Sequence, residues 1–141
     1  MTDLGDLHRF VAAQTPHFAQ ALTEIRAGHK RSHWMWFIFP QFAGLGLSAM
    51  SVRYSIASLD EARAYLSHPL LGPRLIECCE AALAAPDRSA REIFGAPDDT
   101  KLRSCATLFA EVSPPGSVFE RVLDRYFSGE RDQRTLDLIG H

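Results

Sequence analysis

The sequence predicts an all-α protein, folded as a single helical domain over residues 1–141 with about seven or eight helices. Apolar residues recur every three or four positions through most of the chain, which is the spacing of one helix face. Residues typical of helix starts precede these stretches, and glycine or proline follows them. No Asn-Gly or Asp-Gly pair joins alternating apolar segments, so no β-hairpin is expected. With 141 residues, 46% of them hydrophobic, the chain has the size of one domain and can bury a core.

Two helices are predicted before residue 28. Asp3 or Asp6 can cap the first one. Thr15 followed by Pro16 is typical of the N-cap and first turn of the second helix, and Gly28 can end that helix in the left-handed conformation. A continuous helix kinked at Pro16 is the alternative.

Three later helices begin with a capping box, in which a serine is followed three positions on by a glutamate. These serines are Ser58, Ser89 and Ser117, and the helices are expected to end before His68-Pro69, at Gly95 and at Gly129. Three more helices are predicted from apolar spacing between turn residues, and they run from Gly72-Pro73 to Pro86, from Asp98 or Asp99 to Ser113-Pro114, and from Asp132 to Ile139. Asp98 or Asp99 can cap the second of these helices.

The segment at about 29–57 departs from this pattern, and we expect an aromatic-rich irregular or short-helix structure there. Trp34–Phe39 is an uninterrupted apolar run, which fits a short buried strand or a short helix equally well. It is too apolar for the surface, so it should pass through the core and hold the neighbouring cations in place. Gly44 and Gly46 indicate a flexible loop after it. Together these features are typical of a ligand pocket, and the alternative is ordinary core packing beside a solvated turn.

The candidate site residues come from this segment and from a second group of cations. Both lysines of the chain, Lys30 and Lys101, lie near an arginine, and Lys101 is expected in the first turn of a helix, where anions are favoured. The two clusters could converge on one phosphate or carboxylate, and Trp34 or Trp36 could stack on a ring. Histidine can exchange a proton near neutral pH, so His33 is the candidate catalytic residue. The expected ligand-binding residues are Lys30, Arg31, His33, Trp34, Trp36, Gln41, Arg53, Tyr54, Lys101 and Arg103.

Several other functions are disfavoured by composition and spacing. The net charge of −2 argues against nucleic-acid binding through bulk positive charge. The apolar runs are too short to span a bilayer and the N-terminus is acidic, so a cytoplasmic protein without membrane contact is expected. His29 and His33 alone do not make a metal site, and no phosphate-binding glycine motif is present, so we expect no metal and no cofactor. Cys78, Cys79 and Cys105 fit buried thiols in a reducing compartment.

The stretch Lys30–Gln41, which reads KRSHWMWFIFPQ, resembles the signature of the bacterial domain-of-unknown-function 1810 family, sometimes mislabelled calpastatin. Further blocks that agree are 7–14, 53–56, 62–66, 68–75, 93–95, 98–104 and 123–127. The resemblance covers almost the whole chain and implies a small, mainly helical bacterial protein. The family has no established activity, so the resemblance implies no catalytic residue. Nothing in these residues supports the protease inhibition that the calpastatin label implies.

Two functions stay open on these observations. The first is binding of a nucleotide-like or other anionic small molecule at the segment Lys30–Gln41, with hydrolysis of that molecule as an extension. The second is a non-enzymatic module that docks a partner chain, or a second copy of itself, through the Trp-rich segment. A cleft lined by the basic candidates would favour the first function, and their spread over a convex face would favour the second.

Overall fold

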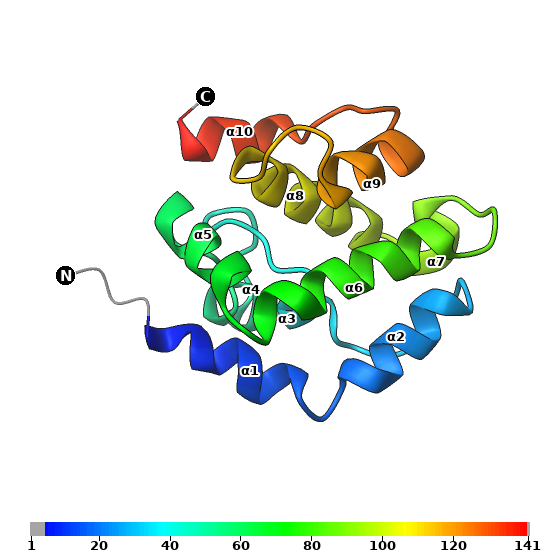
Figure 1. The fold of residues 1–141 in the computed structure, drawn as a ribbon, viewed down its shortest axis with the longest axis horizontal. Helices are drawn as coiled ribbons and strands as arrows, with labels where there is room; N and C mark the ends of the chain where they lie inside the picture. Colours follow the sequence, from blue (N-terminus) through cyan, green and yellow to red (C-terminus); the bar gives the residue numbers. More distant parts are fainter. Residues whose placement is uncertain (1–4, 141) are drawn as a thin grey trace.

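The computed structural model describes residues 5–140, and within them it contains ten α-helices, one 3-10 helix and no β-strand (Figure 1). In chain order these are η1 Gly5–Leu7, α1 His8–Gln14, α2 Phe18–Arg26, α3 Met35–Ile38, α4 Ala49–Arg53, α5 Leu59–Ser67, α6 Leu71–Ala84, α7 Ala90–Phe94, α8 Asp98–Glu111, α9 Val118–Phe127 and α10 Gln133–Ile139. The all-α class is confirmed, and every helix expected from apolar spacing is present. The additional ones, α3 and α4, lie in the segment expected to be irregular or to form short helices.

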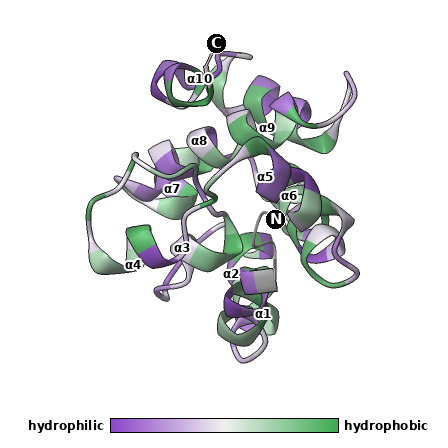
Figure 2. Cartoon of the chain, turned by 90° about the vertical axis from the view of Figure 1, so that its left-hand side faces the viewer, coloured by the Kyte–Doolittle hydropathy of each residue, from purple (hydrophilic) through white to green (hydrophobic). Residues whose placement is uncertain are grey.

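Helix α6 crosses the middle of the molecule, with α8, α9 and α10 on one side and α1 and α2 on the other (Figure 1). It packs against α2, α5 and α9, while α8 packs against α7, α9 and α10. Most helices carry both hydrophilic and hydrophobic residues (Figure 2), and their hydrophobic residues meet in a shared core. The largest fully buried side chains in this core are Trp34, Tyr65, Phe10, Phe39 and Phe109.

Helix α6 begins close against the end of α5 because Gly72 has no side chain. A Cβ atom at this position would collide with the backbone carbonyl oxygen of Leu66 in α5. A backbone carbonyl cannot swing aside as a flexible side chain does, so a larger residue would push α5 and α6 apart.

Three helices begin at the serine N-caps that the sequence predicts, and α10 begins after Asp132, where the sequence places its start. Ser58, Ser89, Ser117 and Asp132 each accept a hydrogen bond from the backbone N–H three residues on, at N···O distances of 3.0, 3.0, 3.3 and 3.1 Å. At Ser89 the capping box is complete, because the Glu92 carboxylate accepts the N–H of Ser89 in return. These short-range signals therefore locate the helix starts correctly.

The predicted start of the second helix is wrong. The Thr15 hydroxyl donates to the Val11 carbonyl at 2.8 Å, at the end of α1, and α2 begins only at Phe18. Residues 15–17 form a turn between the two helices. Neither an N-cap at Thr15 nor one continuous helix kinked at Pro16 describes this junction.

The expected capping roles of the aspartates are also corrected. Asp98 and Asp99 lie inside the first turn of α8, whose N-cap is Pro97. Asp6 lies in η1, where it makes no side-chain cap for α1, and Asp3 lies outside the described residues. The carboxylate of Asp98 forms ion pairs with lysines instead.

The aromatic run Trp34–Phe39 forms the short helix α3 with its flanking residues, so the helical alternative is the correct one. Trp34 and Phe39 are both 1% exposed and belong to the core. Cys78, Cys79 and Cys105 are free thiols and are buried, as expected. Among residues 5–140, no helix combines the length and apolar character needed to cross a bilayer.

Candidate functional site

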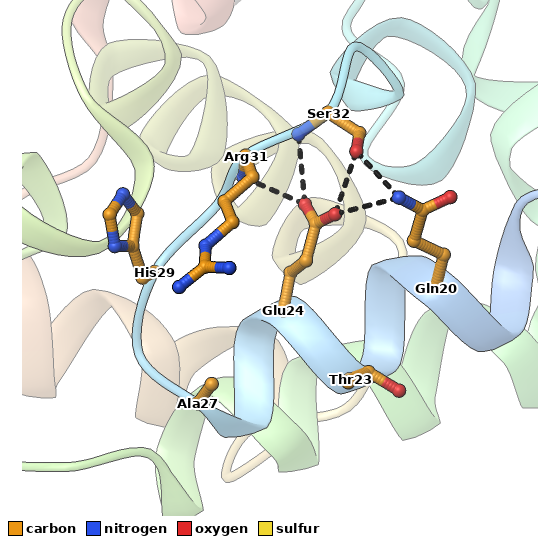
Figure 3. Close-up of a pocket in the computed structure, with 7 residues that line it drawn as sticks. All are labelled: Gln20, Thr23, Glu24, Ala27, His29, Arg31 and Ser32. Atoms are coloured by element: carbon orange, nitrogen blue, oxygen red, sulfur yellow. Dashed lines mark hydrogen bonds between the residues drawn. The ribbon is translucent and has the colours of Figure 1, made fainter.

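The carboxylate of Glu24, in α2, holds the start of the aromatic segment in place (Figure 3). Its Oε1 accepts hydrogen bonds from the backbone N–H groups of Arg31 and Ser32, at 2.8 and 3.0 Å, and from Trp34 Nε1 at 3.0 Å. Its Oε2 accepts the Ser32 hydroxyl at 2.7 Å and the Gln20 side-chain amide at 3.1 Å. One buried acid therefore orders the loop after α2 and orients the first tryptophan.

The Glu24 carboxyl is ionised at neutral pH although it is buried. Burial raises its pKa, but the hydrogen bonds from Arg31, Ser32 and Trp34 lower the pKa by more, to about 2. Because these donors occupy both oxygens, Glu24 acts as a structural anchor. The sequence prediction missed Glu24, because most of its hydrogen-bond donors lie in a loop whose path follows no sequence period.

A first pocket, which we call the Glu24 pocket, has a volume of about 330 Å³ and lies between α2 and the loop after it (Figure 3). It is lined by Gln20, Thr23, Glu24, Ala27, His29, Arg31 and Ser32. Of the expected ligand-binding residues, Arg31 is the one in its wall. The negative charge of Glu24 cancels the positive charge of Arg31 in this wall, so the pocket offers an anion no net positive charge and does not suit the expected ligand.

The two lysines converge on one carboxylate, which the chain itself supplies. Lys30 Nζ lies 2.9 Å from Asp98 Oδ2, and Lys101 Nζ lies 3.4 Å from Asp98 Oδ1. Each ammonium also lies over an indole ring, at 5.1 Å from the Trp34 centroid for Lys30 and 5.4 Å from the Trp36 centroid for Lys101. These are cation–π distances, so the aromatic segment helps to position both cations.

A second pocket, which we call the Lys101 pocket, has a volume of about 270 Å³. It is lined by Gln41, Leu45, Gly46, Pro97, Thr100, Lys101, Ser104, Asp132 and Arg134. Within residues 5–140, the side chains of Gln41, Thr100 and Arg134 make no hydrogen bond or ion pair. Their donor groups are therefore free to contact a ligand.

The acidic residue of the Lys101 pocket, Asp132, is already engaged. Its Oδ2 accepts the hydroxyl groups of Ser104 and Thr135, at 3.1 and 2.5 Å, and the backbone N–H of Thr135 at 3.1 Å. The cations Lys101 and Arg134 line the pocket as well. The charges and the free donors together suit an anionic ligand.

Two aromatic candidates are too buried to contact a ligand, and one of them is Trp34, for which stacking on a ring was predicted. Trp34 is 1% exposed, and Tyr54 is 8% exposed with its ring 5.5 Å from that of Phe37 in an edge-on arrangement. Both rings belong to the core, because Trp34 lies in the apolar run that folds inward and Tyr54, the C-cap residue of α4, packs against Phe37 of that run. Trp36 is half-buried beneath Lys101 and keeps part of its surface exposed.

Besides Lys30, three basic candidates line neither pocket. His33 is exposed and lines neither pocket. Arg53 is exposed and lies over Tyr54, 5.5 Å from the ring centroid. Arg103 donates to two backbone carbonyls in the loop before α10, at 2.9 and 3.0 Å, and so holds that loop.

The expected residues therefore do not line one common cleft. Gln41 and Lys101 line the Lys101 pocket, whereas Arg31 lines the Glu24 pocket. The sequence prediction missed Thr100 and Arg134, which reach the Lys101 pocket from α8 and α10. No motif marks these two residues, because their proximity depends on how the two helices pack.

The fold and this geometry define a small all-α protein with a pocket formed by α8, the start of α10 and the loop at 41–46. The chain belongs to the family described as Protein of unknown function (DUF1810), whose model matches residues 4–139. Its structure is similar to the crystal structure of the conserved hypothetical protein Rv1873 from Mycobacterium tuberculosis, with a TM-score of 0.94 and 51% sequence identity. The similarity covers 96% of this chain and 97% of that protein. None of the curated proteins compared with the chain matches it.

Proposed function

We propose that the protein binds a small anionic molecule in the Lys101 pocket. The observation that carries this proposal is the set of free donors on Gln41, Thr100 and Arg134 beside the ammonium group of Lys101. Phosphate and carboxylate groups accept several hydrogen bonds and bind most strongly to charged donors. The cations would supply attraction, and the neutral donors would orient the ligand.

The volume of the pocket limits the size of this ligand. About 270 Å³ is just below the range of roughly 300–1,000 Å³ that is usual for ligand pockets. The pocket is large enough for a sugar phosphate, a dicarboxylate or the phosphate end of a mononucleotide. A dinucleotide would extend beyond it, and the tryptophans are outside the lining, so base stacking is not part of the proposal.

His33, the candidate for proton transfer, does not line this pocket, so we limit the proposed function to binding. Docking of a partner through the Trp-rich segment has less support. Trp34, Phe37 and Phe39 are buried in the core and offer no contiguous surface to another chain.

Thermal unfolding in the presence of candidate ligands tests the proposal. We expect inorganic phosphate, a sugar phosphate, a mononucleotide or a dicarboxylate to raise the Tm. A ligand at about 100 times its Kd stabilises the native state by about 2.7 kcal/mol. ADP-ribose serves as the larger probe and should give a smaller shift because of its size.

Variants of the pocket identify where the ligand binds. Lys101→Met and Arg134→Ala should each remove most of the Tm shift, because each deletes a cation of the pocket. Arg121→Ala is the matched control, since Arg121 is exposed on α9 and lines neither pocket. A Tm shift that persists in Lys101→Met, or no shift with any probe, would contradict the proposal.

A further inference from the structure

Asp98 has two cationic partners that differ in burial and distance. The Lys30 side chain is 8% exposed and its Nζ is 2.9 Å from Asp98, whereas the Lys101 side chain is 21% exposed and its Nζ is 3.4 Å away. The two contacts use different carboxylate oxygens, so both can form at once. Lys101 also lines the Lys101 pocket, and Lys30 does not.

The two ion pairs differ in the free energy that is needed to break them. A buried ammonium needs a counterion, because removing its partner leaves a charge in a poorly solvated place. Asp98 is the ion-pair partner of Lys30 within residues 5–140, so their contact is costly to break. The longer and more exposed contact to Lys101 is worth less and can be exchanged for another anion.

We infer that Lys30 is a positioning residue for the Lys101 pocket. It neutralises Asp98, so that the charge of Lys101 is available to the ligand. This inference rests on the proposed function, because it assigns a role within the same pocket. Without the charge of Lys30, Asp98 and Lys101 would form a neutral pair, and the pocket would lose one positive charge.

Lys30 could instead matter only as a tether between the loop and α8. Its backbone N–H already donates to the Ile93 carbonyl at 2.7 Å, so the loop is held to α7 without the side chain. The two accounts differ in one measurable respect. A tether requires the contact between Lys30 and Asp98, whereas charge compensation requires only that the net charge of Lys30, Lys101 and Asp98 stays the same.

Substitutions that change the net charge of this group of three residues distinguish charge compensation from a tether. Lys30, Lys101 and Asp98 together carry one net positive charge, and this falls to zero in Lys30→Met, rises to two in Asp98→Asn and returns to one in the double variant. Lys30→Arg keeps the charge. Lys30→Met is close in length to lysine and suits a buried position over an indole ring.

Titration calorimetry with inorganic phosphate and with a sugar phosphate measures the effect at low ionic strength. We expect Lys30→Met to weaken binding about tenfold and Asp98→Asn to strengthen it by a similar factor. The double variant and Lys30→Arg should bind within about threefold of the wild type. Thermal unfolding of every variant shows which ones are folded, and Arg121→Ala is the control for loss of an arbitrary surface cation.

The possible results separate the two proposals. If the wild type binds but Lys30→Met binds equally tightly, or if the double variant is as weak as Lys30→Met, the role of Lys30 is overturned and the pocket stands. If neither probe binds to the wild type, the proposed pocket fails and the role of Lys30 fails with it. Should Asp98→Asn lose its fold, the double variant still decides the outcome, because it contains no buried unpaired ammonium.

Discussion

Among single residues, Glu24 does most to shape the region around the candidate site. Burying a carboxylate is costly unless its oxygens receive hydrogen bonds, and those of Glu24 receive five from the loop, the first tryptophan and its own helix. The same contacts place Trp34 in the core and send the chain toward α3. The ionised form is therefore part of the folded structure.

Replacing Glu24 with Gln should lower the free energy of unfolding by about 2–3 kcal/mol at neutral pH. The folded-state pKa of about 2 lies below the ordinary 4.5, so this stabilisation is fully present above pH 4.5 and is lost as the pH falls toward 2. Urea unfolding of the wild type and of Glu24→Gln, at neutral pH and at about pH 3, measures the difference.

Glu80→Gln is the control for this measurement, because Glu80 is exposed on α6. It should leave both the stability and its pH dependence almost unchanged. Equal pH dependence in the wild type and in Glu24→Gln would contradict the assigned role of Glu24.

The sequence was sufficient to predict the importance of the two lysines, but it was not sufficient to predict the role of Glu24. Lys30 and Lys101 could be singled out because they are the lysines of an arginine-rich chain, and they do share a carboxylate. The role of Glu24 could not be predicted, because most of its donors lie in a loop whose path follows no sequence period. The sequence predicted that the apolar run containing Trp34 is buried. It did not indicate that this burial leaves the Trp34 ring without a surface on which a ligand could stack.

At the level of helices, Arg125 of α9 holds the end of α6. Its guanidinium donates to the backbone carbonyls of Ala82, Ala85 and Pro86 at 3.0, 2.8 and 3.0 Å, and also to that of Leu83. The last carbonyls of a helix have no partner within the helix, and a cation there also opposes the negative end of the helix dipole. Arg125 therefore satisfies carbonyls at the end of α6 and joins this end to α9, together with the Tyr126 hydroxyl, which also donates to the Ala82 carbonyl.

Arg125→Met should reduce the free energy of unfolding by about 2 kcal/mol, because it leaves partly buried carbonyls without donors. Hydrogen exchange should accelerate first in the last turn of α6. Arg121→Met, on the same helix but at an exposed position, should change stability by less than about 0.5 kcal/mol. If urea unfolding gives the two variants equal stability, Arg125 does not have this role.

Helices with apolar residues at three- or four-residue spacing could be predicted one by one, whereas the short helices α3 and α4 could be expected only as irregular or short-helix structure. Ser58, Ser89 and Ser117 cap their helices through contacts only three residues long, so a single sequence contains the information. The helix α3 has four residues and no apolar period, so strand and helix could not be told apart. The turn after Thr15 was missed because proline fits a turn as well as a first helical turn.

At the scale of the whole molecule, the core protects all three cysteines. Burial raises the pKa of Cys78 to about 12, and it raises the pKa values of Cys79 and Cys105 well above the ordinary value. The thiolate is the reactive form, so these thiols are unreactive while the core is closed.

We therefore expect the native protein to show no reaction with a thiol-specific colorimetric reagent at neutral pH over minutes. All three thiols should react after denaturation in urea, and the slow reaction without denaturant should follow the rate of global opening. Rapid reaction of one thiol in the folded protein would show that the core opens locally at that cysteine.

The Lys101 pocket is also a property of the whole molecule. Its walls come from the loop at 41–46, from α8 and from the start of α10. The sequence could indicate two members of this set, Gln41 and Lys101, because they lie in or near recognisable segments. The other lining residues come close to Gln41 and Lys101 only through tertiary packing, which cannot be predicted from the spacing of residues along the chain.

The loop after α2 turns successive side chains in opposite directions. His29 and Arg31 face the Glu24 pocket, while Lys30 between them reaches Asp98. The number of residues between Gly28 and Trp34 is thus as important as their identity, since inserting one residue would place an arginine or a histidine where the ammonium now lies. Relatives of different loop length could keep every charged residue and still have a differently charged pocket.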